Sequence, residues 1–378
     1  MEVFTHTLKG EVWTRRGRSA PQGAQLALVF APAGQLRRAA TWQRLRALHP
    51  KARIVACSSG GQILDAGVHD VDLLCTGVRL ARSHLELASV RREEGADCLA
   101  RGRLLGERLR PEGLRHVFVL AEGLAVNGSQ LAQGLGQSLP SGVRVTGGLA
   151  GDGERFADAA VFLDGHDPDY GAVAIGFYGD ALRIGHGCAG GWEAFGIDRR
   201  ITRAEGNELL ELDGEPALDV YRRYLGPQAH DLPASGLLFP LAIWPQDATG
   251  EPLVRTIRGI DDARGSLKFA GDMPVGCRAR LMKAQPGSLV SSAGQAVATA
   301  LSGMEGHAAQ LALLVSCECR KIVMKQEVLQ ELQLARQSLG PTAAIAGFFS
   351  YGELAPLGEG TPCALHNQTL TFTTLAEA

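Results

Sequence analysis

The chain has 378 residues, and its hydrophobic content of 45% and charged content of 21% are ordinary for a soluble globular protein. The net charge of −2 gives no electrostatic basis for nucleic acid or an anionic membrane as a partner. No apolar run approaches roughly 18 residues and no signal-peptide pattern opens the chain, so we expect a cytoplasmic protein whose eight cysteines are reduced.

The first 24 residues predict an irregular N-terminal arm. From residue 25, apolar runs alternate with segments of helical spacing, a pattern typical of βαβ units in a mostly parallel sheet. The predicted strands are 25–31, 53–57, 71–76, 114–120 and 143–149. The predicted helices are 36–48, 83–109 and 129–139. Three closely spaced runs, 159–163, 171–178 and 181–186, predict an antiparallel meander that completes a first α/β domain over 25–212.

Residues 213–378 predict a second, α+β domain with a mixed sheet, because strands and helices follow each other without strict alternation. Its predicted helices are 216–225, 291–304 and 325–339. Its predicted strands are 237–244, 253–257, 267–270, 278–284, 310–316, 343–350 and 369–374.

Polar and reactive side chains cluster at the ends of predicted strands, where loops commonly carry binding and chemistry. Glycines beside them allow tight turns or the close approach of a ligand. We therefore predict a small-molecule ligand site at these strand ends or between the two domains. The candidate ligand-binding residues are Cys57, Ser58, Asp152, Cys317, Arg320, Glu353 and Asn367.

Five of these candidates have an alternative, structural role. Cys317 is either a buried apolar residue or a thiol whose pKa Arg320 lowers, with Cys319 on the same strand face; metal binding is a third alternative. Arg320 and Glu353 either form a structural ion pair or Arg320 binds a carboxylate of the ligand. Asp152 could instead form an Asx turn, and Asn367 could fix a strand end.

Ordered motifs from residue 25 to the C-terminus resemble the FIST sensory family. Near the C-terminus these are Ser316-Cys317-Glu318-Cys319-Arg320, Gly347-Phe348-Phe349-Ser350-Tyr351-Gly352-Glu353 and Asn367-Gln368-Thr369. In the first half, Ala56-Cys57-Ser58-Ser59-Gly60-Gly61 and Gly147-Gly148-Leu149-Ala150-Gly151-Asp152 are similar to its strand-end motifs. The family prefers glycine where this chain has Cys319, a difference that narrows a pocket or adds a second thiol.

The resemblance implies an intracellular sensory module that binds a small ligand and is not an enzyme. It implies signalling to a separate protein, such as a histidine kinase or a cyclic-dinucleotide enzyme. Some family members resemble haem-containing nitric-oxide sensors. Haem is therefore an alternative cofactor, with His186 or His230 as the axial ligand. The G-x-G-x-x-G match at Gly185–Gly190 leads into no predicted helix and does not indicate dinucleotide binding.

An alternative from another class is a thiol-dependent enzyme. In this hypothesis Cys317 is the nucleophile, His366 the base and Glu353 the group that orients the base. The residue types suit that chemistry, but their spacing in the sequence does not establish that they are close in space.

Overall fold

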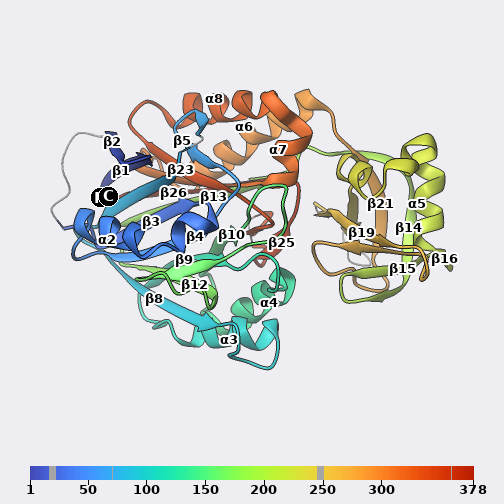
Figure 1. The fold of residues 1–378 in the computed structure, drawn as a ribbon, viewed down its shortest axis with the longest axis horizontal. Helices are drawn as coiled ribbons and strands as arrows, with labels where there is room; N and C mark the ends of the chain where they lie inside the picture. The colour runs from blue at the N-terminus through green and yellow to red at the C-terminus, as the bar shows by residue number, and fades with distance from the viewer. Residues whose placement is uncertain (17–22, 70, 245–250, 359) are drawn as a thin grey trace.

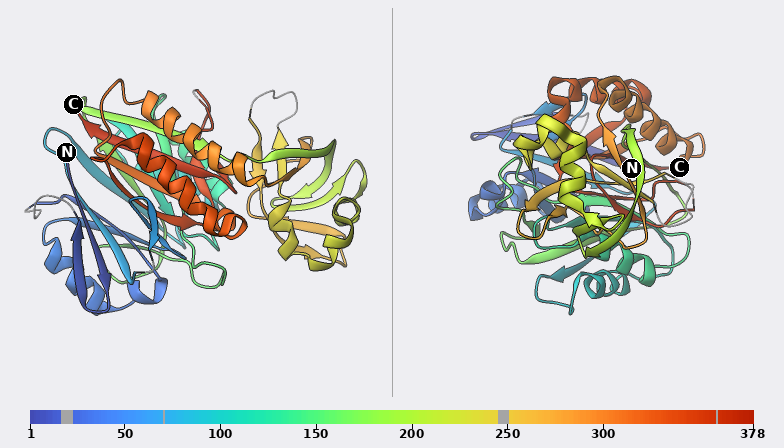
Figure 2. Two further views of the ribbon diagram at one scale, coloured as in Figure 1. Left: turned by 90° about the horizontal axis from the view of Figure 1, so that it is seen from above. Right: turned by 90° about the vertical axis from the view of Figure 1, so that its right-hand side faces the viewer.

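The chain folds into a large main body and a small lobe that projects from one end of it (Figures 1 and 2). The computed structural model describes residues 1–16, 23–69, 71–244, 251–358 and 360–378. The small lobe runs from β14 (Glu193–Glu205) to β21 (Arg278–Lys283) and is inserted between β13 (Leu182–Ala189) and α6 (Pro286–Ser302) of the main body. Both chain ends lie at the far end of the main body from the small lobe (Figure 2).

Three six-stranded sheets build the main body. The first has the order β11 (Val161–Leu163), β4 (Arg53–Ser58), β3 (Leu26–Ala31), β7 (Leu73–Arg79), β1 (Glu2–Lys9), β2 (Val12–Arg16). The second has the order β25 (Ala364–His366), β24 (Glu353–Ala355), β10 (Arg144–Leu149), β9 (Leu114–Ala121), β12 (Tyr170–Tyr178), β8 (His84–Arg91). The third has the order β13, β26 (Leu370–Glu377), β22 (Leu311–Cys317), β23 (Ala344–Ser350), β5 (Gln62–Leu64), β6 (Gly67–His69).

The sheets are mixed, and most strand pairs are antiparallel. Among the pairs of the described residues, β3–β4, β9–β10 and β22–β23 are parallel. The prediction of a mostly parallel sheet in the N-terminal half was therefore wrong. The predicted meander was also wrong, because β11, β12 and β13 enter three different sheets. Short connections suggested hairpins, but each of these strands pairs with a strand distant in sequence.

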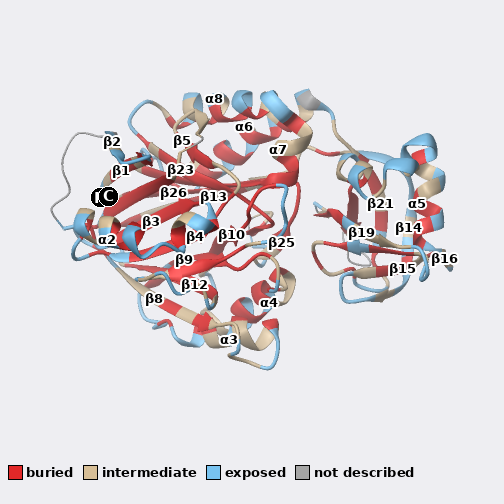
Figure 3. Ribbon diagram, in the orientation of Figure 1, coloured by how far each residue is buried: buried red, intermediate tan, exposed pale blue. Residues whose placement is uncertain are grey.

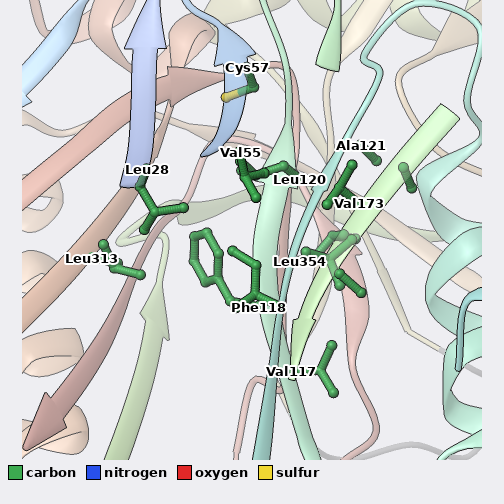
Figure 4. Packing of buried hydrophobic residues seen from close by; sticks show 14 of the residues in the cluster. Leu28, Val55, Cys57, Val117, Phe118, Leu120, Ala121, Val173, Leu313 and Leu354 are labelled. Carbon is green, nitrogen blue, oxygen red and sulfur yellow. The ribbon is translucent and has the colours of Figure 1, made fainter. Parts of the chain in front are cut away.

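Alternating side chains explain how the sheets pack. Along β3, Leu26, Leu28 and Phe30 face the large core between the sheets, while Ala27 and Val29 face a second cluster with α1 (Ala33–Leu36) and α2 (Ala39–Leu48). Figure 4 shows one residue from each sheet, Leu28, Phe118 and Leu313, in the large core. The central strands of the main body are accordingly buried, whereas the edge strand β8 is largely intermediate (Figure 3).

Helices cover the outer faces of these sheets. The third sheet packs its other face against α6 and α8 (Val328–Leu339), with Ala312 and Leu314 of β22 in a shared cluster. The second sheet packs against α3 (Cys98–Glu107) and α4 (Gly128–Ser138). A short helix, α7 (Glu318–Met324), follows β22 directly and continues through η3 (Lys325–Glu327) to α8. No helix in the described ranges is long and apolar enough to cross a membrane.

Two parts of the N-terminal half differ from the prediction. The predicted irregular arm contains β1 and β2, and β1 pairs with β7 in the first sheet; residues 17–22 of the arm lie outside the described residues. The predicted helix 83–109 is strand β8 followed by α3. β8 pairs with β12 along its whole length and buries Ala88 and Val90 on one face, so tertiary pairing overrides the helical propensity of the segment.

The small lobe is an antiparallel sheet with one helix, α5 (Ala217–Leu225), packed against it. Its strand order is β18 (Leu253–Arg255), β17 (Leu241–Trp244), β21, β14, β15 (Glu208–Leu212), β20 (Ser266–Phe269), β19 (Ile257–Asp261), with β16 (Glu215–Pro216) beside β15. Two 3₁₀ segments, η1 (Gly226–Asp231) and η2 (Ala234–Leu238), follow α5. The two predicted segments 25–212 and 213–378 both contribute strands to the main body and to the small lobe.

Glycines 185 and 187 allow α6 to lie directly on β13. A Cβ atom on Gly185 would be 1.7 Å from the carbonyl oxygen of Ala300, and one on Gly187 would be 2.0 Å from that of Ala296. The glycine-rich motif therefore serves the packing of α6 on β13. This role agrees with the expectation that the motif does not bind a dinucleotide.

We expect Gly185→Ala to lower the free energy of unfolding by about 3 kcal/mol or more, because the clash is with backbone atoms that cannot rotate away. Gly136→Ala is the matched control: nothing lies within 4 Å of its ideal Cβ position on α4, and alanine favours a helix. Urea denaturation should show the control unchanged or slightly stabilised. Equal stability of the two variants would contradict the packing assigned to Gly185.

Candidate functional site

Strand ends from different sheets meet at the end of the main body that carries the small lobe. A Cβ atom on Gly60, after β4, would lie 2.3 Å from the Cα of Gly153, after β10, and 2.8 Å from Oε2 of Glu318, after β22. The hydroxyl of Ser59 accepts a hydrogen bond from the backbone N–H of Phe349 at 3.1 Å. The convergence of strand ends predicted from the sequence is thus present.

Arg320 is completely buried and binds protein groups only. Its Nε donates to Oε1 of Glu331 on α8 at 2.9 Å. Its other nitrogens donate to the carbonyl oxygens of Leu289 at 2.7 Å and Gln368 at 3.2 Å, and to that of Gly190. The guanidinium therefore joins α6, α7 and α8 to two loops, and its donors are occupied without a ligand.

Arg320 forms its ion pair with Glu331 and none with Glu353, so a structural ion pair between Arg320 and Glu353 is not formed. The carboxyl group is fully buried and accepts hydrogen bonds from the hydroxyls of Ser350 at 2.6 Å and Thr369 at 2.7 Å. Burial, and next the nearby Cys317, raise the pKa of Glu353 well above its usual value. Glu353 therefore acts as an internal hydrogen-bonding group.

Cys317 and Cys319 do not share a strand, because β22 ends at Cys317 and α7 begins at the next residue. The side chains of the two cysteines still line the same hollow. Burial, followed by the neighbouring Cys319, raises the pKa of Cys317 well above its usual value. The predicted lowering of this pKa by Arg320 was wrong, since a buried thiolate loses its hydration.

The arrangement lacks what a thiol-dependent enzyme requires. His366 lies opposite Glu353 on the neighbouring strand, but its Nε2 contacts the carbonyl oxygen of Ala355 at 2.8 Å. Its Nδ1 has no hydrogen-bond partner among the described residues, and burial lowers its pKa to about 4. Neither an activated thiolate nor a base hydrogen-bonded to it is formed.

A small hollow lies where the main body meets the small lobe. Its free volume is about 10 Å³, enough for roughly one water molecule. Residues from both parts of the chain line it: Phe156, Cys317, Cys319, Tyr351 and Asn367 from the main body, and Thr256, Arg258 and Ala270 from the small lobe.

Two buried polar side chains at this hollow have unused hydrogen-bonding capacity. Oδ1 of Asn367 accepts from the backbone N–H of Thr256 at 3.5 Å and so links the two lobes. Nδ2 of Asn367 and Oγ1 of Thr256 have no partner among the described residues. An unsatisfied buried polar group costs about 1–3 kcal/mol, so both groups favour a polar guest in the hollow.

Aromatic rings and one arginine form the mouth of the hollow. The rings of Phe156 and Tyr351 are stacked with centroids 4.5 Å apart, and the guanidinium of Arg258 lies over both, at 5.3 and 5.9 Å. Phe156 has φ = 49°, a conformation that is rare for a bulky residue and is found preferentially at functional sites. Arg258 makes no ion pair within the described part of the chain, so its charge is available to a guest.

The first-half candidates support the fold around this hollow. Cys57 is enclosed in the large core, where Figure 4 shows it near Val55, and burial raises its pKa well above the usual value. The hydroxyl of Ser58 accepts from the backbone N–H of Ala160 at 2.9 Å. Burial alone would raise the pKa of Asp152, but hydrogen bonds from Tyr351 and from two backbone amides lower it.

Other polar contacts hold the small lobe against the main body. Arg255, which is buried, donates to the carbonyl oxygen of Leu365 at 2.8 Å, and burial lowers its pKa to about 10. Nδ2 of Asn127 donates to the carboxylate of Asp272 at 2.7 Å. Sequence reasoning missed the small-lobe residues Thr256 and Arg258, because no motif marks them.

The two candidate haem ligands lie in different places. His230 is on η1 of the small lobe with its side chain 94% exposed. His186 is on β13 and, with Arg144, lines a cleft of about 350 Å³ beside the end of α6. Burial, and then the charge of Arg144, lower the pKa of His186, which favours the neutral imidazole that binds metals. Neither histidine lies at the hollow between the lobes.

Glu353→Gln provides a pH test of the buried carboxyl group. Because the folded-state pKa of Glu353 is raised, its stabilising contribution is complete below the unfolded pKa near 4.5 and is lost as pH rises toward the folded pKa. Relative to the wild type, the variant should gain about 1 kcal/mol or more of unfolding free energy between about pH 5 and about pH 8. Urea denaturation at both pH values measures the difference; a pH-independent difference would exclude the raised pKa.

Comparison with known families identifies the chain. The model of the FIST N domain matches residues 25–215, and the model of the FIST C domain matches residues 217–356. No curated protein matches the chain. FIST domains are associated with sensing in signal transduction. Together the two matches cover most of the sequence, and the chain belongs to the FIST family.

Proposed function

We propose that this protein is a small-ligand sensor whose ligand binds in the hollow between the main body and the small lobe. The observation that carries the proposal is the pair of buried, unsatisfied groups on Asn367 and Thr256, one from each lobe, beside the unpaired charge of Arg258. These are mainly hydrogen-bond donors, so they favour a ligand rich in acceptors or negative charge.

An organic ligand requires the hollow to widen, because its free volume of about 10 Å³ admits only a water-sized guest. The small lobe is connected to the main body by two chain crossings, between β13 and β14 and between β21 and α6. Rotation of the lobe about these crossings would open the hollow and separate Asn367 from Thr256. A ligand that prefers the open arrangement would then shift the population of lobe positions.

The output of such a shift is a changed surface presented to another protein. Association of FIST domains with signal transduction supports a separate partner in the cytoplasm, and a histidine kinase or a cyclic-dinucleotide enzyme is the proposed class. In this proposal, five of the residues predicted as ligand contacts instead support the loops around the hollow. They are Cys57, Ser58, Asp152, Arg320 and Glu353.

We expect Arg258→Gln to abolish stabilisation by the ligand while leaving the free protein folded. The side chain is exposed, and among the described residues it makes ring contacts alone, so its loss should change the unfolding free energy by no more than about 0.5 kcal/mol. A thermal-shift survey with anionic metabolites, including mono- and dicarboxylates and phosphate esters, identifies the ligand through a raised melting temperature.

Arg38→Gln is the matched control, since Arg38 is an exposed arginine at the N-cap of α2. It should respond to the ligand like the wild type. If no metabolite raises the melting temperature of the wild type, or if Arg258→Gln responds as strongly, the ligand site is not at this hollow.

The haem alternative rests on His186 rather than His230. His186 would hold the iron, and Arg144 in the same cleft would pair with a carboxylate of the haem. When bound, haem iron would supply a site for a diatomic gas. The chain's own contribution is a neutral imidazole held on β13 and a positive charge beside it.

We expect haemin bound through His186 to show a Soret band that shifts with nitric oxide and is lost in His186→Ala. His230→Ala serves as the control and should keep the band, because its side chain is exposed on the small lobe. Absorption spectra of the reconstituted proteins decide the matter; a wild-type spectrum equal to that of free haemin would exclude haem.

A further inference from the structure

We propose that Cys317 and Cys319 bind a single soft monovalent cation of the Cu(I) type within the hollow between the lobes. This inference goes beyond the proposed sensory function, because it follows from the geometry of two thiols whether or not the protein signals. It also gives a role to Cys319, the residue in which this chain departs from the glycine of the resembled family.

The backbone holds the two thiols together before any metal binds. β22 ends at Cys317, whose N–H donates to the carbonyl oxygen of Thr369 at 3.1 Å. The first turn of α7 then places the Cys319 side chain at the same hollow as that of Cys317. Arg320, fixed by Glu331 of α8, anchors that turn. A preorganised pair of ligands loses little conformational entropy on binding.

The number and type of ligands favour a soft cation with two-fold coordination. Structural zinc takes four protein ligands, and no group of three or more His, Cys, Asp or Glu residues suited to a metal occurs in the described ranges. The remaining polar residues at the hollow, Thr256, Arg258 and Asn367, are not soft ligands. Thiolates suit Cu(I), zinc and iron–sulfur clusters. Structural zinc and iron–sulfur clusters take four protein ligands, so two thiolates favour Cu(I).

The size of the hollow agrees with a single ion. Its free volume of about 10 Å³ admits one water-sized particle in the closed arrangement, without movement of the small lobe. An organic ligand would need the lobes to separate, whereas an ion would not.

The charges around the hollow favour the complex that would form. One Cu⁺ replaces the two thiol protons, which pass to the solvent, and the resulting bis-thiolate carries one negative charge; no electrons are transferred. Arg258 lines the hollow and has no ion pair among the described residues, and Nδ2 of Asn367 is a buried donor without a partner. A buried anion is stable only where such positive and hydrogen-bonding groups face it.

The test is an anaerobic titration of the reduced full-length protein with Cu(I) in competition with bathocuproine disulfonate. We expect one equivalent to be retained by the wild type, with a thiolate-to-copper absorption band in the ultraviolet. Loss of a group that only hydrogen-bonds to a metal ligand lowers metal affinity about 10–100-fold. Cys319→Gly and Cys317→Ser each remove a direct ligand, so each should lower the affinity by at least that factor. X-ray absorption should show two sulfur neighbours of copper.

Cys277→Ser, which removes a buried thiol of the small lobe, is the matched control and should retain one equivalent. Circular dichroism verifies that each variant is folded. Because glycine at position 319 could destabilise α7, Cys319→Ser provides a second variant that lacks the thiol. Retention of the metal by both Cys319 variants, or no retention by the wild type, overturns the inference. If Cu(I) is not retained but an anionic metabolite stabilises the protein, the metal site fails while the sensory proposal stands.

Discussion

The buried guanidinium of Arg320 is the interaction on which the arrangement of the site depends. It binds the carbonyl oxygens of Gly190 and Leu289, which lie just before and just after the small lobe in the chain. It also binds the carbonyl of Gln368, next to Asn367, and the carboxylate of Glu331. One side chain therefore fixes both connections to the small lobe and the loop that carries the unsatisfied amide. Removing one partner of such a buried pair costs about 3–5 kcal/mol.

This constraint explains why the charged residues of the C-terminal motifs are not themselves at the hollow. Arg320 and Glu353 are fully buried and satisfied by protein groups, which leaves them no capacity for a ligand. They hold the loops from which Cys317, Tyr351 and Asn367 reach the hollow. A sequence motif at a site can thus contain residues that never contact the ligand. Such residues position the contact residues, and their identity is therefore constrained as well.

Sequence reasoning named part of the lining of the hollow but not the whole of it. The strands of the parallel pairs, such as 25–31, 53–57 and 310–316, were predicted closely, because continuous apolar runs mark strands buried on both faces. Cys317 and Asn367 were predicted and do line the hollow. The partners of Arg320 lie 11 to 130 residues away in the sequence, and Thr256 lies 111 residues from Asn367. These contacts depend on tertiary packing, on which local periodicity carries no information.

The small lobe couples the two halves of the family's sequence. The FIST N match ends at residue 215 and the FIST C match begins at residue 217, within the small lobe. There β14 and β15 of the first half pair with β21 and β20 of the second. In the main body the halves also share sheets, through β10–β24 and β23–β5. Each half of the sequence therefore contributes strands to both lobes. A ligand-driven movement of the small lobe would reach the main body through the two chain crossings, from β13 of the first half and into α6 of the second half.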